Sequence, residues 1–135
     1  MSELSPTPGT PPLNELSCAA LAYLGDSVLE LLVREHLIAA GLSTAAHLNR
    51  AAAEYVTARA QAQAMLRILP LLDEQESAIF RRGRNNVHGN VPKSATVSEY
   101  RTATGMECLF AALYLGGKQE RLRALFDAAY RPDEQ

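Results

Sequence analysis

Two acidic residues could do chemistry, because each lies in an apolar stretch whose spacing predicts a buried helix. Asp26 directly follows Gly25, and Glu107 lies two residues after Gly105 among Met, Cys, Leu, Phe and Ala residues. A buried charge is costly unless it is paired or binds a cation. Two helices that pack at their glycines would bring these carboxylates together, because no Cβ atom holds the backbones apart. The pair would then form an oxygen-rich site for Mg²⁺ or Mn²⁺.

Asp26 also has a simpler interpretation. A single Asp on a helix is most often partly exposed or ion-paired, so Asp26 alone would not indicate a site. Glu30 shares a helix face with Asp26, but Arg34 follows it by one turn. We therefore expect Glu30 to be an ion-paired surface residue. The similar setting of Glu107 makes a shared metal site the better explanation of Asp26.

The sequence around both acids resembles one known family. The string Leu24-Gly25-Asp26-Ser27-Val28-Leu29 is similar to the signature of the ribonuclease III endonuclease domain, and Glu107 with residues 111–115 resembles the second acidic helix of that domain. Further similarity lies in residues 55–62, in residues 81–85, and in Pro92-Lys93 followed by Tyr100-Arg101. These details and the chain length resemble the Mini-ribonuclease III branch, whose members are catalytic domains without a double-stranded-RNA-binding domain.

The resemblance implies a metal-dependent endoribonuclease. The expected protein is a homodimer with two catalytic centres in one valley, each cutting one strand of double-stranded RNA and leaving a short 3′ overhang. Membership of the branch implies maturation of 23S ribosomal RNA precursor ends, with a ribosomal protein as a possible partner. Asp26 and Glu107 are the expected catalytic residues and the direct ligands of Mg²⁺, for which Mn²⁺ would substitute.

Two positions depart from the full-length ribonuclease III enzymes. Those enzymes carry further carboxylates one turn before each acid, where this sequence has Ala22 and Thr104. The same departures are typical of the Mini-ribonuclease III branch, so they do not indicate an inactive enzyme. Fewer carboxylates should bind a hard cation more weakly and leave more waters on it. Thr104 is a candidate to orient one of these waters.

Basic residues are concentrated late in the chain, although the formal net charge is −2. The sequence predicts a mobile polar loop from Arg81 to Lys93, whose arginines and asparagines suit contacts with phosphates and 2′-hydroxyls. A solvated linker is the alternative interpretation of this loop. Arg101 shares a helix with Glu107 and could reach the scissile phosphate. The candidate RNA-binding residues are Arg81, Arg82, Arg84, Asn85, Lys93, Tyr100 and Arg101.

Apolar spacing and capping signals predict an all-α fold. Ser17 should cap a helix over 18–40 that buries Leu31 among its apolar residues, and Gly41 should end it. The other predicted helices are one capped by Ser43 or Thr44, one over 55–69 with a break near 56–57, a short one from Asp73 through Phe80, one from Thr96 to residue 115, and one over 118–130.

Composition and length indicate one cytoplasmic globular domain. The chain has 135 residues, of which 47% are apolar and 21% charged. Residues 1–15 hold four of the seven prolines and should form a disordered tail, and residues 16–132 should form the catalytic domain. No apolar run is long enough to cross a membrane, and the N-terminus lacks signal-peptide blocks. Cys18 and Cys108 have no paired spacing, so we expect both to be small core residues.

Two other classes of function remain open at this point. The first is a ribonuclease III-like module that binds structured RNA without cutting it, and such a module has no need of facing acids. The second is a helical dimerisation or adaptor protein, for which the basic segment would have no use. A measurement of duplex-RNA binding at a stated salt concentration would distinguish the adaptor, which has no RNA role, from both the enzyme and the RNA-binding module.

Overall fold

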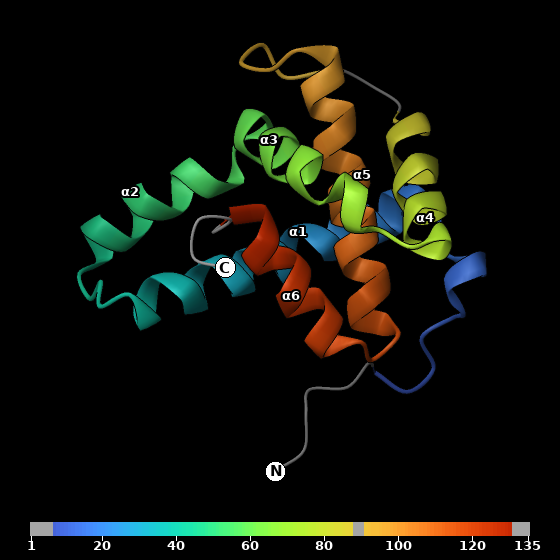
Figure 1. Ribbon diagram of the computed structural model, residues 1–135, viewed down its shortest axis with the longest axis horizontal. Coiled ribbons are helices and arrows are strands. Elements are labelled where there is room, and N and C mark those ends of the chain that lie inside the picture. The colour runs from blue at the N-terminus through green and yellow to red at the C-terminus, as the bar shows by residue number, and fades with distance from the viewer. Residues whose placement is uncertain (1–6, 88–90, 131–135) are drawn as a thin grey trace.

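The computed structural model describes residues 7–87 and 91–130, and the regular structure in this part of the chain is entirely helical (Figure 1). The predicted all-α class is therefore confirmed. Residues 1–6 of the predicted tail and the predicted domain end at residue 132 lie outside the described residues. The elements are η1 (Leu13–Glu15), α1 (Cys18–Ala39), α2 (Ala45–Val56), α3 (Ala58–Ile68), η2 (Leu69–Leu71), α4 (Glu74–Asn85), α5 (Val97–Leu115) and α6 (Gln119–Tyr130).

Helix α5 is the central element of the fold. Its residues from Cys108 to Leu113 are all buried, which is expected of a helix that is apolar on every side. Helices α1, α3, α4 and α6 pack around it, and Figure 1 shows them on different sides of α5. Fully buried Leu29 and Val33 of α1 and Met65 of α3 belong to the same hydrophobic cluster as Phe110 of α5.

The predicted helix ends are confirmed by their hydrogen bonds. The Ser17 hydroxyl accepts the Ala20 N–H at the start of α1. Thr57 ends α2 and caps α3, so the predicted break falls at this residue. Reciprocal capping boxes start α4 and α5, with Asp73 and Thr96 as the respective N-caps. Each box satisfies two backbone N–H groups that the helix itself leaves unpaired.

The predicted loop from Arg81 is wrong at its beginning, because α4 continues to Asn85. Gly83 is the reason. A Cβ atom at Gly83 would lie 2.8 Å from Cys108 Sγ and 3.1 Å from the Gly105 Cα atom, so this glycine permits close packing of α4 on α5 instead of starting a turn. His88 to Asn90, which also belong to the predicted loop, lie outside the described residues.

The two glycines beside the acids pack against different helices. A Cβ atom at Gly25 would overlap the Glu107 backbone carbonyl, so α1 and α5 cross in contact there, as expected. Gly105 faces Phe80 of α4 instead of α1. Leu31 does not belong to the buried stripe of α1, because it is 50% exposed. Of the two glycines beside the acids, only Gly25 therefore lies at the contact between α1 and α5.

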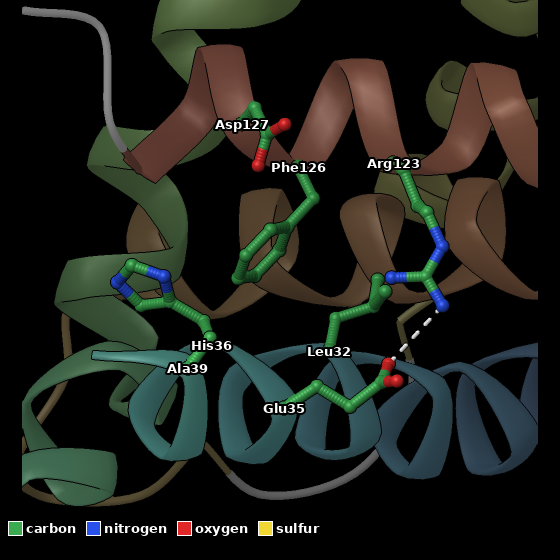
Figure 2. Close-up of a pocket in the computed structure, with 7 residues that line it drawn as sticks. All are labelled: Leu32, Glu35, His36, Ala39, Arg123, Phe126 and Asp127. Atoms are coloured by element: carbon green, nitrogen blue, oxygen red, sulfur yellow. Dashed lines mark hydrogen bonds and ion pairs between the residues drawn. The ribbon is translucent and has the colours of Figure 1, made fainter. Parts of the chain in front are cut away.

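Polar contacts hold α6 on the neighbouring helices. The Arg121 guanidinium donates to both carboxylate oxygens of buried Glu76 at 2.8 Å and so joins α6 to α4. Figure 2 shows the opposite side of α6, where Arg123 pairs with Glu35 of α1 at 3.2 Å and Phe126 lies between α6 and α1. No helix among the described residues has both the length and the apolar character of a membrane span.

Ordered structure begins within the segment predicted as a tail. Residues Leu13–Glu15 form the turn η1, and Leu13 packs against a small cluster around buried Leu21 and Cys108. Cys108 is buried as expected, and Cys18 is half-buried beside it. The Cys108 thiol lies 3.5 Å from the Cys18 carbonyl oxygen. The N-terminal segment is thus attached to the same helices that carry the two acids.

Candidate active site

Asp26 and Glu107 line the same cavity. Asp26 comes from α1 and Glu107 from α5, and the contact of Gly25 with the Glu107 backbone holds these two positions together. The cavity has a volume of about 460 Å³, and α3 and the segment before α5 form its other walls. Its remaining lining residues are Val56, Thr57, Ala58, Arg59, Gln61, Pro92, Ser94, Ala95, Tyr100, Ala103 and Thr104.

The two acids differ in their exposure. Glu107 is half-buried, whereas Asp26 is exposed, so the expected burial of Asp26 is wrong. Position 26 follows Gly25, whose backbone contacts α5, but the Asp26 side chain lines the cavity and is not part of the core. Asp26 therefore bears little of the desolvation cost of a buried charge. Glu30 pairs with Arg34 at 3.3 Å, as expected of a surface residue.

The environment of Glu107 favours its neutral form. Burial and the nearby Asp26 charge raise the pKa of Glu107 from 4.5 to about 8, and a hydrogen bond with the Gln61 side chain opposes the rise. Desolvation and a like charge both disfavour ionisation of a carboxyl group. A divalent cation held by Asp26 and Glu107 would favour the ionised form of Glu107, because its charge attracts both carboxylates and offsets their repulsion.

The donor set of the cavity fits a hard cation that keeps part of its water. Among residues 7–87 and 91–130, no three His, Cys, Asp or Glu side chains gather where they could hold a metal. Two carboxylates on one open cavity suit Mg²⁺, which is commonly bound by one or two carboxylates with water and substrate phosphate as further ligands. Asp26 and Glu107 would hold such an ion.

Thr104 and Tyr100 also lie at this cavity, as their candidate roles require. The Thr104 hydroxyl donates to the Tyr100 carbonyl oxygen at 2.9 Å, so its oxygen can still accept a hydrogen bond from a water in the cavity. Arg59, which belongs to the segment of residues 55–62 named above, is the basic residue among those that line this cavity. Sequence reasoning did not include it among the candidate RNA-binding residues. It also missed Gln61 as a site residue.

The basic residues expected to bind RNA do not lie together at one site. Arg84, Asn85 and Arg101 line a second cavity of about 410 Å³ together with Val97, Ser98 and Thr102. On α5, the residues of this cavity lie on a different face from Tyr100, Thr104 and Glu107. Arg101 therefore does not line the cavity of the two acids. The Arg84 guanidinium lies 5.5 Å from the centre of the Phe80 ring, which holds it by a cation–π contact.

Arg82 has a structural contact. Its guanidinium donates to the Leu16 carbonyl oxygen at 2.7 Å and so ties the N-terminal segment to α4. Arg81 and Lys93 are exposed and line neither of the two cavities. Lys93 stands between Pro92 and Ser94, which line the cavity of the acids. The structure thus brings Arg84, Asn85 and Arg101 together at one cavity, which the other candidates do not line.

Comparison with known proteins agrees with this arrangement. Residues 19–118 match the Ribonuclease III domain. The chain is 44% identical over 110 residues to a Mini-ribonuclease 3 of Brevibacillus brevis, covering 82% of each chain. It is 46% identical over 109 residues to a Mini-ribonuclease 3 of Symbiobacterium thermophilum, covering 81% of this chain and 84% of the relative.

A solved structure shares the fold as well. The crystal structure of a protein from Fusobacterium nucleatum superposes with a TM-score of 0.80 at 30% sequence identity, covering 90% of this chain and 97% of that chain. Asp26 and Glu107 both fall within the matched family domain. The chain therefore belongs to the ribonuclease III family, and the expected resemblance to its Mini-ribonuclease III branch is confirmed.

Proposed function

We propose that this ribonuclease is a divalent-metal-dependent endonuclease that cleaves double-stranded RNA at the cavity of Asp26 and Glu107. The observation that carries the proposal is the meeting of these two carboxylates, from separate helices, on one open cavity. A non-catalytic RNA-binding module would have no use for a carboxyl group whose pKa is raised by burial and by a second acid.

The residues of the cavity suit hydrolysis of a phosphodiester bond. Mg²⁺ or Mn²⁺ bound there would supply an activated water and a counter-charge for the transition state. Asp26 and Glu107 would hold the ion, and the Thr104 hydroxyl would accept a hydrogen bond from a water beside Glu107. The exposed Arg59 guanidinium at the cavity wall would bind the phosphate that enters.

Cleavage of long duplex RNA tests this function directly. The protein is incubated with duplex RNA, and with one of its strands alone, in Mg²⁺ and in chelator. We expect cuts in the duplex with Mg²⁺ and none in chelator or in the single strand. Binding without cutting at any metal concentration would contradict the proposal and favour the RNA-binding module.

The biological substrate proposed by resemblance is the precursor of 23S ribosomal RNA, cut near its mature ends in the cytoplasm. The names of the relatives specify a ribonuclease and give no substrate. A ribosomal protein that reshapes the precursor would be a natural partner, because a protein that reads A-form RNA depends mainly on its shape.

We further propose that the protein acts as a homodimer through the outer face of α1. Tyr23, Leu31 and Ile38 are 85%, 50% and 63% exposed, and their spacing places them on one side of this helix. Exposed apolar groups of this size on one face commonly mark an interface. Because Asp26 lies on the same helix as Tyr23, a second copy packed on this face would bring its own cavity close to the cavity of the first copy.

Replacing Tyr23 by Glu is expected to convert the dimer into a monomer, because a carboxylate in an apolar interface is desolvated without a partner. The molar mass is measured by light scattering after gel filtration, with the wild type expected at twice 14.7 kDa. Leu66→Glu is the matched control, since Leu66 is 61% exposed on α3. An unchanged mass of Tyr23→Glu would place the interface elsewhere.

The second cavity is the proposed binding place for RNA phosphates outside the cleavage site. Replacing Arg84 and Arg101 by Ala should weaken duplex binding and lower the slope of log affinity against log salt by about 0.7 to 0.9 for each phosphate that is no longer bound. The cleavage rate at saturating RNA should change much less, because neither residue lines the cavity of the acids.

The control for this measurement is Arg50→Ala, which removes an exposed arginine from α2, outside both cavities. It should leave the salt slope unchanged. A wild-type slope for the Arg84 and Arg101 variant would mean that RNA docks elsewhere, most simply along the Arg59 side of α3.

A further inference from the structure

Gln61 is a buried amide in contact with the candidate metal-binding acid. It lies on α3, is only 3% exposed, and lines the cavity of Asp26 and Glu107. Its side chain lies on this cavity close enough to the Glu107 carboxyl group to lower the pKa of that group as a hydrogen-bond donor. Among the described residues, the other buried polar side chain is Glu76, which accepts hydrogen bonds from the Arg121 guanidinium and from the Asp73 backbone N–H. Gln61 is therefore the buried polar group at the cavity.

A second hydrogen bond fixes the orientation of the Gln61 amide. Its nitrogen donates to the Val56 carbonyl oxygen at 3.2 Å. Val56 is the last residue of α2, where carbonyl groups have no partner within the helix. The Tyr130 hydroxyl donates to the neighbouring Tyr55 carbonyl at 3.1 Å. With one amide proton held by Val56, the other is available for Glu107.

The chemistry of an amide suits this position. A Lys or Arg beside Glu107 would pair with the carboxylate and compete with a cation, whereas a neutral amide can orient the carboxylate without neutralising it. Carboxylates that bind metals are commonly held by hydrogen bonds of this kind. Removal of such a partner typically lowers metal affinity or activity by about 10- to 100-fold, so a loss of this size is expected when Gln61 is replaced.

We infer that Gln61 is a positioning residue, which links the end of α2 to Glu107 and holds that carboxylate in the orientation that binds the divalent cation. The inference rests on the proposed function, since it assigns a role within the same site. It also explains the break between α2 and α3. Because Thr57 ends one helix and caps the next, the Val56 carbonyl is left within reach of the Gln61 side chain on the first turn of α3.

The test compares Gln61→Met with wild type, because Met has a similar length and cannot donate either hydrogen bond. Binding of Mn²⁺ is measured without RNA by titration, and RNA cleavage is measured against Mg²⁺ concentration. We expect about 10-fold weaker Mn²⁺ binding, a matching shift of the Mg²⁺ dependence to higher concentration, and an unchanged KM for RNA. Gln63→Met, at an exposed position two residues away, is the control and should match wild type.

A second variant covers the case in which Gln61→Met does not fold. Gln61→Asn keeps the amide but is shorter by one methylene, so it cannot reach both partners, and it should show the same reduction in Mn²⁺ affinity. In the Glu107→Gln background, Gln61→Met should cause no further reduction. Wild-type Mn²⁺ affinity in either folded Gln61 variant would overturn the inference. If the wild type bound Mn²⁺ but cut no RNA, the proposed function would be refuted. The role of Gln61 in metal binding would still be tested, because the comparison of Mn²⁺ affinities does not use RNA.

Discussion

Replacing Glu107 by Gln is expected to remove RNA cleavage while making the folded protein more stable. The amide keeps the size of the side chain but loses the charge that binds the cation, so cleavage should fall by at least about a thousandfold, or about 4 kcal/mol in the barrier. Stability should rise because the wild-type carboxyl group is half-buried and lies near the Asp26 charge. Both effects are measured on the same preparation, by cleavage in Mg²⁺ and by thermal unfolding in chelator.

The gain in stability should depend on pH. The pKa of Glu107 is raised from 4.5 to about 8 in the folded protein. Between these values the unfolded chain has released the proton and the folded protein still holds it, so the unfolding free energy of the wild type falls as pH rises. The fall is at most about 1.4 kcal/mol per pH unit. Glu107→Gln lacks this fall, so its gain in stability over the wild type should be absent near pH 4.5, grow with pH, and reach a plateau above about pH 8.

Asp26→Asn provides the companion measurement. Cleavage should be lost as in Glu107→Gln, but the change in stability should be smaller because Asp26 is exposed. Mg²⁺ should raise the melting temperature of the wild type more than that of either variant, since a cation bound only to the folded state stabilises it. Near wild-type turnover in one variant would remove that residue from the site, and equal shifts with Mg²⁺ would exclude it as a ligand.

Replacing Gly25 by Ala is expected to destabilise the protein by at least about 3 kcal/mol, the upper part of the usual range for overpacking. The added Cβ atom would overlap the Glu107 backbone carbonyl, and backbone atoms cannot move aside as a side chain can. Helices α1 and α5 would have to separate, which would also move the two acids apart. Urea unfolding gives the decrease in stability, and cleavage at low temperature gives the decrease in activity of the fraction that folds.

Gly116→Ala is the matched control for this substitution. Gly116 follows α5 with a φ of −78°, which alanine adopts readily, and the nearest atom to an added Cβ would be the Ala112 carbonyl oxygen at 3.2 Å. Its effect should stay below about 1 kcal/mol. If Gly25→Ala had wild-type stability, the close contact of α1 with α5 would not be needed for folding.

The sequence predicted most helix boundaries because these depend on local chemistry. Capping boxes at Asp73 and Thr96 and the break at Thr57 are signalled within a few residues of the positions concerned. Gly83 shows the limit of such reasoning. A glycine among arginines has the local pattern of a turn, but its role is set by Cys108 and Gly105 on another helix. Local sequence holds no signal for that contact.

The candidate site was predictable in part for the same reason. Family resemblance and isolated acids pointed to Asp26 and Glu107, but the exposure of Asp26 and the separate cavity of Arg101 depend on how whole helices pack. Gln61 did have a usable signal. It precedes buried Ala64, Met65 and Ile68 by three, four and seven residues, so the helical period places a polar side chain on the buried stripe of α3.

The position of Glu107 on α5 has a consequence for the motions of the site. Backbone amides in the central helix of a core exchange with solvent only through the largest opening reactions of a protein. The Glu107 backbone lies in that helix, against Gly25, between buried Met106 and Cys108. The spacing of the two acids should therefore persist for as long as the molecule stays folded. Under the proposed function, adjustment to an irregular RNA duplex must then come from exposed side chains such as Arg59, while the spacing of the two acids stays fixed.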